Sequence, residues 1–139
     1  DANQSMAVAT GSDIKGFEDL DGKSVGVKTA SMSATYAESL ADQYGFTVTY
    51  FEDSPTMYQA VVGGQVAACF DDTPIMASNI KDTGIGMEIV DGTGNEPAEY
   101  GFAIFNPDNQ ELIDMFNKGL ANIKADGTYD EIIAKYLGE

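Results

Sequence analysis

The spacing of apolar and polar positions changes period several times along the chain. Residues 4–10 alternate apolar and small side chains, as at Met6 and Val8, which is typical of a strand. Further short apolar runs that predict strands occupy residues 23–27, 46–51, 66–70 and 87–90. Apolar residues recur at helical spacing in the segments between them, 31–44, 54–62 and 73–81. The pattern therefore predicts strands and helices that alternate over residues 23–90.

Two helix ends have clear local signals. Ser54 followed by Pro55 predicts a helix that begins with Ser54 as its N-cap. Gly45 follows the helical pattern that starts near Ser31 and predicts its C-cap. A short polar connection over residues 11–22 holds one further turn around residues 17–20.

The alternation of strands and helices predicts an α/β fold. Its short spacing implies right-handed crossovers and a mostly parallel sheet with helices on both faces. In such sheets ligands bind outside the carboxyl ends of the strands. We therefore expect the loops after Val27 and after Phe70 to form the site.

The C-terminal part of the chain has a different character. Residues 100–105 read as a strand, residues from Asn106 onward as a long amphipathic helix, and residues 129–136 as a last helix. Together these helices carry an apolar face formed by Leu112, Ile113, Phe116, Leu120, Ile123, Ile132, Ile133 and Leu137. Such a face is too apolar to stay exposed on a soluble monomer, so it must pack on residues 1–100 or on another copy.

The charge of the chain excludes some partners. It holds 7 basic and 23 acidic residues, for a formal net charge of −16, and every basic residue is a lysine. Such a surface repels phosphate backbones and anionic lipids, so we expect no binding to nucleic acid or to a membrane surface. The chain begins at Asp1 without a methionine or signal peptide, which suggests processing or excision from a longer protein.

Residue types for catalysis or metal binding are scarce. The chain has no histidine, and its one cysteine, Cys69, lies in an apolar run. The usual zinc sets and catalytic triads are therefore excluded. The acidic segment 19–22 lacks the full calcium-loop pattern, and the glycine pairs 84–86 and 92–94 lack the context of a dinucleotide site. We expect no metal, no cofactor and no enzymatic activity.

The segment 28–33 follows a strand and opens a helix. Unpaired N–H groups at such a helix start favour an anion, and Ser and Thr hydroxyls add donors. A carboxylate suits this position. An ordinary capped helix beside a solvated Lys28 is the alternative.

Asp71 and Asp72 follow the apolar strand 66–70. Successive side chains on a strand point to opposite sides, so one carboxylate can enter a cleft while the other caps the helix at Pro74. A carboxylate at a cleft edge is suited to hold an ammonium group. Two exposed aspartates in a turn are the alternative. Taken with the preceding anion site, the pair fits a zwitterion.

Four segments resemble the bacterial extracellular solute-binding proteins of family 3, the polar amino-acid binders that feed ABC importers. They are Gly22–Thr29, Tyr58–Pro74 with its Asp72-Thr73-Pro74 motif, Glu99–Ile104 and Gly127–Tyr136, the last being the most specific. The resemblance covers essentially the whole chain and implies a periplasmic-binding-protein type 2 fold, in which two lobes clamp the ligand.

The resemblance also implies a division of the chain. Residues 1–10 would be the outgoing hinge strand, residues 11–98 lobe two, residues 99–105 the return hinge strand, and residues 106–139 the C-terminal helices that belong to lobe one. The opening segment of lobe one has no counterpart in this sequence.

The family's ligand contacts carry over to a small set of positions. The implied ligand-binding residues are Lys28, Thr29, Ser31, Met32, Ser33 and Asp72. The backbone around Ser31 and Met32 would meet the α-carboxylate, and Asp72 would pair with the α-ammonium. Lys28 stands where the family's glutamine binders place a lysine near the ligand side chain, which favours glutamine.

Two departures from the family pattern bear on this site. Ala30 and Met32 stand where glycine, or glycine and threonine, are usual, so a hydroxyl contact is lost at position 32. The family also clamps the carboxylate with an arginine from lobe one, and this chain has none. We therefore expect the chain alone to bind weakly or not at all.

The resemblance implies a binding module outside the cytoplasm, in the periplasm or at the cell surface, as a lipoprotein tethered to the membrane in its full-length form. Its partners would be an amino acid, an ABC permease, and a second copy through exchanged C-terminal helices. A ligand-sensing receptor domain and a dehydratase-like enzyme on the same fold are the alternatives.

Overall fold

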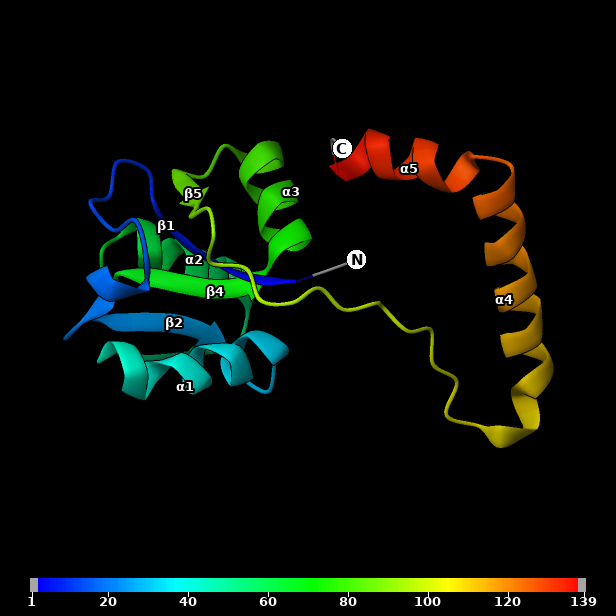
Figure 1. The fold of residues 1–139 in the computed structure, drawn as a ribbon, viewed down its shortest axis with the longest axis horizontal. Helices are drawn as coiled ribbons and strands as arrows, with labels where there is room; N and C mark the ends of the chain where they lie inside the picture. The colour runs from blue at the N-terminus through cyan, green and yellow to red at the C-terminus, as the bar shows by residue number, and fades with distance from the viewer. Residues whose placement is uncertain (1–2, 138–139) are drawn as a thin grey trace. The chain divides into compact units, whose positions relative to one another are not determined.

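A computed structural model describes residues 3–137, and the chain divides into two compact units (Figure 1). The N-terminal unit is Asp1–Ala98 and the C-terminal unit is Glu99–Glu139. No helix among residues 3–137 is both long enough and apolar enough to cross a membrane.

The N-terminal unit is built on one five-stranded sheet in the order β3-β2-β4-β1-β5. The strands are β1 Gln4–Ala9, β2 Ser24–Lys28, β3 Thr47–Phe51, β4 Ala68–Asp72 and β5 Met87–Ile89. β2 runs parallel to β3 and β4, whereas β1 runs antiparallel to β4 and β5. Four strands thus share one direction and β1 alone opposes them, which confirms the mostly parallel sheet predicted from the sequence.

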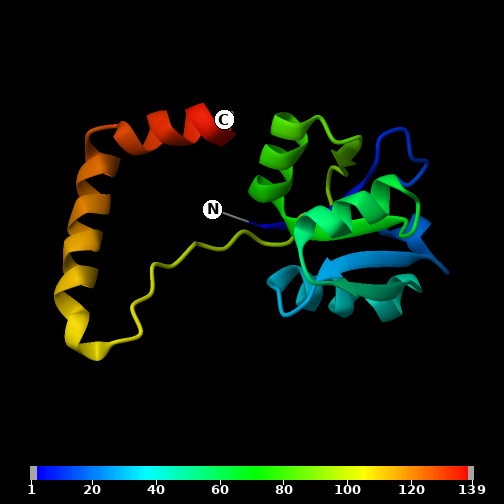
Figure 2. The same cartoon turned by 180° about the vertical axis from the view of Figure 1, so that it is seen from behind.

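Helices cover both faces of this sheet, as the α/β pattern predicts. They are α1 Met32–Tyr44, α2 Ser54–Val62 and α3 Thr73–Thr83, with a 3-10 turn η1 at Phe17–Leu20. α1 and η1 pack on one face, and α2 and α3 pack on the other. Seen first in Figure 1, α2 is partly hidden by the sheet, and it comes forward in Figure 2.

Strand alternation produces two separate cores. Met6 and Phe70 contribute to the core under α1, while their neighbours Ala7 and Cys69 contribute to the core under α2 and α3. Each of these side chains is fully buried. Because successive strand residues point to opposite faces, short apolar runs supply both cores at once.

The helix ends agree with the sequence signals except at α2. Ser31 caps α1 through its hydroxyl, and Gly45 closes that helix in the left-handed region, at φ 72°. The predicted N-cap of α2, Ser54, is wrong: the carboxylate of Asp53 accepts the N–H of Thr56 at 2.8 Å instead. Asp53 takes the capping place because the Ser54 hydroxyl donates to Asp71, in the neighbouring strand β4.

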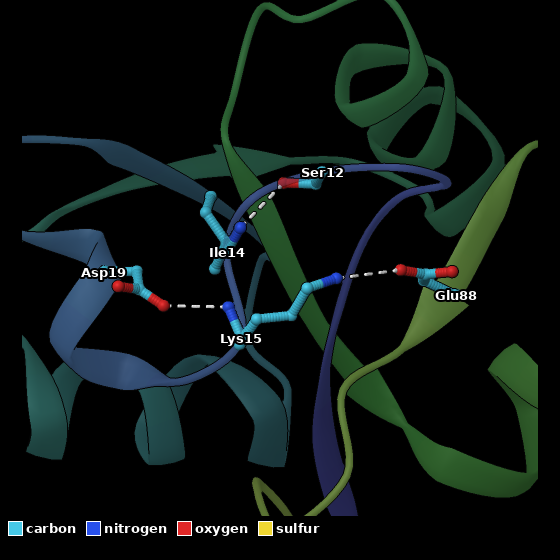
Figure 3. Close-up of polar contacts among 5 residues, drawn as sticks. All are labelled: Ser12, Ile14, Lys15, Asp19 and Glu88. Atoms are coloured by element: carbon cyan, nitrogen blue, oxygen red, sulfur yellow. Dashed lines mark hydrogen bonds and ion pairs between the residues drawn. The ribbon is translucent and has the colours of Figure 1, made fainter.

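The loop between β1 and β2 is held by its own polar groups (Figure 3). The carboxylate of Asp19 accepts the N–H of Lys15 at 2.8 Å, and the Lys15 ammonium lies 3.6 Å from a carboxylate oxygen of Glu88 on β5. This is the only ion pair between side chains in the part of the chain that is described. Most of the acidic surface is therefore not neutralised by lysine.

The C-terminal unit consists of extended chain followed by helices. They are η2 Pro107–Asn109, α4 Gln110–Ala125 and α5 Thr128–Leu137, which agree with the predicted amphipathic helix and last helix. The strand predicted at residues 100–105 is not observed. A strand needs a partner strand to take its backbone hydrogen bonds, and the described sheet is formed by β1 to β5. Their role as a return hinge stays a prediction.

No described side chain of α4 is buried, although the predicted apolar pattern is present. Leu112 and Phe116 remain 49% and 40% exposed, and Ile132 on α5 is 46% exposed. Phe102 stacks on Phe116 with ring centroids 4.1 Å apart. The side chain of Leu137, the last member of the predicted apolar face, lies outside the described part.

Candidate functional site

One edge of the sheet collects three strand ends and three helix starts. Because β2, β3 and β4 are parallel, their carboxyl ends lie together, and α1, α2 and α3 each begin within a few residues of that edge. Helix N-termini present N–H groups that favour negative charge. The edge matches the place where open α/β sheets bind ligands.

The loop from β2 to α1 is held by side-chain hydroxyls. The Thr29 hydroxyl donates to the carbonyl of Phe51 at 3.1 Å, and the Ser31 hydroxyl donates to the carbonyl of Lys28 at 2.6 Å. Ser31 Oγ also accepts the N–H of Ala34. These hydroxyl protons serve the loop itself, so the predicted hydroxyl contacts to a ligand are already engaged at Thr29 and Ser31.

The groups left over at this helix start are backbone ones. The N–H groups of Met32 and Ser33 lie in the first turn, where no intrahelical acceptor exists. The Met32 side chain is 69% exposed, whereas Ser33 is buried and its hydroxyl contacts that of Ser31 at 2.9 Å. The start of α1 therefore offers backbone N–H groups, the kind of donor that a bound anion accepts from.

Ala30, just before α1, adopts a left-handed backbone with φ 55°. It is the only described residue other than glycine with a positive φ. This conformation costs an alanine roughly 1–2 kcal/mol, and such strain is concentrated at functional sites. Ala30, one of the two residues that depart from the family pattern, is therefore the one whose backbone is strained.

Asp71 and Asp72 take different environments at the end of β4. Asp71 is 1% exposed; its carboxylate accepts the Ser54 hydroxyl at 2.6 Å, the Tyr58 hydroxyl at 3.0 Å and the N–H of Asp72 at 2.9 Å. Asp72 is half-buried and accepts only from the Gln4 side-chain amide, at 2.6 Å, among the described contacts. Asp72 is thus the carboxylate with room for a ligand.

The prediction that one of these aspartates caps the helix at Pro74 is wrong. Asp72 occupies the N-cap position of α3, but its side chain makes no capping hydrogen bond. The carboxylate turns to Gln4 instead, because these two residues are partners in the antiparallel register of β1 and β4.

Asp71 also affects its neighbours electrostatically. Burial, and secondarily the Asp71 carboxylate, raise the pKa of the Tyr58 hydroxyl and of the Cys69 thiol. A buried thiol whose pKa is raised is a poor nucleophile. Cys69 is therefore a core residue, as its apolar sequence context predicts.

Strand alternation separates the predicted site residues. Val27 and Phe70 are partners on the α1 face, and extending that register by two residues sets Thr29 beside Asp72. Asp72 and the start of α1 therefore share one face. A Cβ atom at Gly26 would meet Met57 of α2, so position 26 faces α2, and Lys28, two residues along β2, leaves the strand on the same face. The fold therefore sets Asp72 and the start of α1 on one face of the sheet and the base of the Lys28 side chain on the other.

Among residues 3–137, no cluster of three or more acidic or cysteine side chains is arranged to hold a metal ion.

Gln4, whose side-chain amide donates to Asp72, was not singled out by the sequence pattern. Its only signal is a polar side chain in alternation with Met6 and Val8, at an inward-facing position of β1.

Comparison with known proteins places the chain in a family context. Residues 2–139 match the family described as bacterial extracellular solute-binding proteins, family 3. The ABC transporter arginine-binding protein 1 of Escherichia coli (strain K12) is 30% identical over 134 residues, which are 94% of this chain and 54% of the relative. The chain spans about half the length of the curated relatives it matches.

Solved structures agree with this match. Substrate binding domain 2 of Lactococcus lactis GlnP, in an open conformation, is 40% identical with a TM-score of 0.72, over 99% of this chain and 59% of that domain. The ancestral amino acid-binding protein AncCDT-1, a precursor of cyclohexadienyl dehydratase, is 30% identical with a TM-score of 0.79, over 99% of this chain and 59% of that protein.

Proposed function

The chain belongs to the bacterial extracellular solute-binding proteins of family 3, and from this we propose that it forms the ligand-closing lobe of an amino-acid binder for an ABC importer. The observation that carries the proposal is the shared face of Asp72 and the start of α1. One offers a carboxylate for an ammonium group, and the other offers N–H groups for a carboxylate. An α-amino acid carries both groups on one carbon.

We propose glutamine as the preferred ligand, held with the contribution of Lys28. The ammonium of Lys28 pairs with no carboxylate among the described residues, so it is available to a polar ligand side chain. Lys28 starts on the α2 face, so it must reach over the strand edge to a ligand bound beside Asp72. Thr29, Ser31, Met32 and Ser33 then shape the loop that receives the carboxylate.

Closure of lobe two, formed by residues 11–98, onto lobe one would complete the site around the ligand. Removal of water strengthens charge pairs such as the one proposed for Asp72. In the family an arginine from the other lobe clamps the carboxylate, and this chain contains no arginine. We therefore propose that the 139-residue chain alone binds amino acids weakly. From the family we propose in addition that its protein acts outside the cytoplasm as a membrane-tethered lipoprotein. The permease would recognise the closed form.

We also propose that the exposed helices of the C-terminal unit pair with a second copy. The reason is the apolar face of α4 and α5, whose members Leu112, Phe116 and Ile132 are 40–49% exposed. Exchange of an element between identical chains reuses complementary surfaces. Light scattering should give at least a dimer at micromolar concentration, and a monomer mass without binding of an apolar dye would contradict the exchange.

A dehydratase function is the second candidate, since AncCDT-1 is a precursor of such an enzyme. An enzyme would need a free acid or base in the cleft. Asp71 is buried with three internal hydrogen bonds, which leaves Asp72 and Lys28. Turnover of prephenate or arogenate by the chain would favour the enzyme over the binder.

The decisive experiment supplies the other half of the site. Residues 1–139 are joined to the part of the Lactococcus lactis domain that has no counterpart here, and calorimetry measures binding of L-glutamine, L-arginine and L-histidine. Asp72→Asn should weaken binding by roughly 2–5 kcal/mol, because the ligand ammonium loses its charge partner. Lys28→Met should change the order of preference among the three.

Asp114→Asn is the matched control, because Asp114 is an exposed carboxylate that likewise accepts from a glutamine, Gln110, at 3.1 Å. It should leave affinity unchanged. Equal affinity of the Asp72→Asn variant and the parent chimera would remove Asp72 from the site, and an unchanged preference profile would remove Lys28.

A further inference from the structure

The side chain of Gln4 is buried in an unusual way for a glutamine. Only 8% of the residue is exposed, and its neighbours in alternation on β1, Met6 and Val8, are apolar. Its Nε2 donates to Asp72 Oδ1 at 2.6 Å. An ionised carboxylate can only accept, so the amide nitrogen must face Asp72 and the amide oxygen must point away.

The amide oxygen of Gln4 is left without a partner. Oε1 is buried and accepts no hydrogen bond among the described residues. Burial of an unpaired amide oxygen is unfavourable, whereas an apolar side chain would fill the same place on the α1 face without that cost. Packing therefore does not account for a glutamine here. The short bond to a charged carboxylate is the compensating interaction.

The backbone of Gln4 ties a second segment to the same point. Its N–H donates to Asn95 Oδ1 at 2.6 Å, and its carbonyl accepts the N–H of Asn95 at 3.0 Å. Two residues along, the N–H of Met6 donates to the buried Thr93 hydroxyl at 3.1 Å. Residues 93–95 thus run beside β1, on the side opposite β4. Gln4 lies between Asp72 and the segment that leads out of the N-terminal unit.

We propose that Gln4 is a positioning residue for ligand binding. It holds Asp72 Oδ1, so that Oδ2 is left to face the ligand ammonium, and it links that carboxylate to the Asn95 segment. The inference rests on the proposed amino-acid binding at Asp72. It adds a residue that does not touch the ligand but sets the direction of the group that does.

The first test needs no ligand. In the ¹⁵N-labelled 139-residue chain, the side-chain amide protons of Gln4 are followed by NMR while the pH is lowered through the titration of the carboxylates. They should shift as Asp72 is protonated, and Asp72→Asn should abolish that shift. The exposed pair Gln110 and Asp114 on α4 joins the same types of donor and acceptor atom at 3.1 Å and is the internal control, with a smaller shift expected. A Gln4 amide that ignores the ionisation of Asp72 overturns the inference.

The second test measures affinity for L-glutamine in the chimera described above. Gln4→Met keeps the length and burial of the side chain but removes the donor. It should weaken binding about tenfold, the factor expected when a hydrogen bond to a charged group is lost. Gln110→Met should have no effect. Circular dichroism melting verifies that each variant is folded.

Gln4→Glu separates a positioning role from a structural one. The introduced carboxyl group repels Asp72 when ionised but can donate to it when protonated. Binding should therefore be weak at neutral pH and recover as the pH is lowered toward about 5, a profile that Gln4→Met should not share. If the parent chimera binds L-glutamine and both Gln4 variants bind it with the same affinity, the inference is overturned and the proposed function stands. No binding by the parent overturns the proposed function and the inference with it.

Discussion

The two units of the chain have equally clear helix signals, but their apolar side chains differ in burial. In the N-terminal unit, Phe70 and Met57 are fully buried between sheet and helices. In the C-terminal unit, Phe116 and Met115 stay 40% and 62% exposed although α4 is strongly amphipathic. An apolar stripe predicts that a helix will need a covering surface, but it does not identify that surface.

The difference also concerns polar groups. Buried polar side chains such as Asp71 and Ser33 occur in the N-terminal unit, where neighbouring elements supply their hydrogen bonds. The side-chain hydrogen bond described in α4 joins two residues of the same helix, Gln110 and Asp114. A binding site needs polar groups from several elements held together, and the candidate site gathers its groups from β1, β4 and α1 of the first unit.

Hydrogen exchange should give the largest contrast. In a sample dilute enough to keep the chain monomeric, amides of β2 and β4, which lie in the interior of the sheet, should exchange about a thousandfold more slowly than those of α4, because a helix without a buried face opens locally at little cost. Mass spectrometry at the peptide level measures both in one sample. The protection of α4 should increase with chain concentration as a second copy covers its apolar face, and equal protection in the dilute sample would contradict the contrast.

Matched truncations should reproduce the contrast as free energy. Phe70→Ala empties a buried site and should lower the free energy of unfolding of the N-terminal unit by about 3–5 kcal/mol. Phe116→Ala should change the stability of the same unit by less than about 0.5 kcal/mol, since it lies in the other unit. Urea unfolding followed by near-ultraviolet circular dichroism of the aromatic rings that contact Phe70, which are Phe17, Tyr36 and Phe46, measures both. A large effect of Phe116→Ala there would show that the two units are coupled.

Alkaline pH should weaken the N-terminal unit through Tyr58 and Cys69. Their pKa values in the folded chain are raised by burial, so the folded unit keeps protons that the unfolded chain releases from about pH 8.5 for cysteine and about 10 for tyrosine. Stability is therefore full at neutral pH and falls above about pH 9, by up to about 1.4 kcal/mol per pH unit for each group. Urea midpoints at increasing pH measure the slope. Cys69→Ala should flatten its first part, and an unchanged slope would exclude the thiol as the cause.

The smallest effects are expected from alanine-to-glycine substitutions, whose effects on stability should have opposite signs in the two units. Ala30→Gly should stabilise the N-terminal unit by about 0.5–1 kcal/mol, because glycine adopts the left-handed backbone at φ 55° without strain. Ala121→Gly, in the exposed middle of α4, should instead destabilise that helix by about 1 kcal/mol. Thermal melts measure the first and helical circular dichroism the second. A destabilising Ala30→Gly would show that the loop is not strained.

Local signals were the most reliable guides to the fold. The strand at Met6 and Val8, the helix start near Ser31 and the C-cap at Gly45 each depend on neighbours in sequence, and each is found as predicted. The errors arose where a distant group competes. Asp53 caps α2 while the hydroxyl of Ser54 donates to Asp71 on β4, and residues 100–105 have strand character but form no strand.

The candidate site was predicted in outline and completed by the fold. That strand ends at Lys28 and Asp72 would lie at one edge follows from the βαβ pattern alone. The pattern does not predict which of the two aspartates is buried, because Asp71 and Asp72 differ through their contacts with residues of other elements. Asp71 accepts from Ser54 and Tyr58, and Asp72 accepts from Gln4. The part played by Gln4 depends on a register between strands that are 68 residues apart.

The sequence by itself determined the α/β class, the approximate positions of the helices and of strands β1 to β5, the absence of histidine chemistry and the resemblance that led to the family. These properties depend on short-range periodicity, composition and local motifs. Only the tertiary structure decided that Asp71 is buried, that Asp72 meets Gln4, and that Lys28 and Asp72 leave the sheet on opposite faces. The physical reason is that burial and hydrogen-bond partners are set by strand register and helix packing, which bring together residues that no local pattern connects.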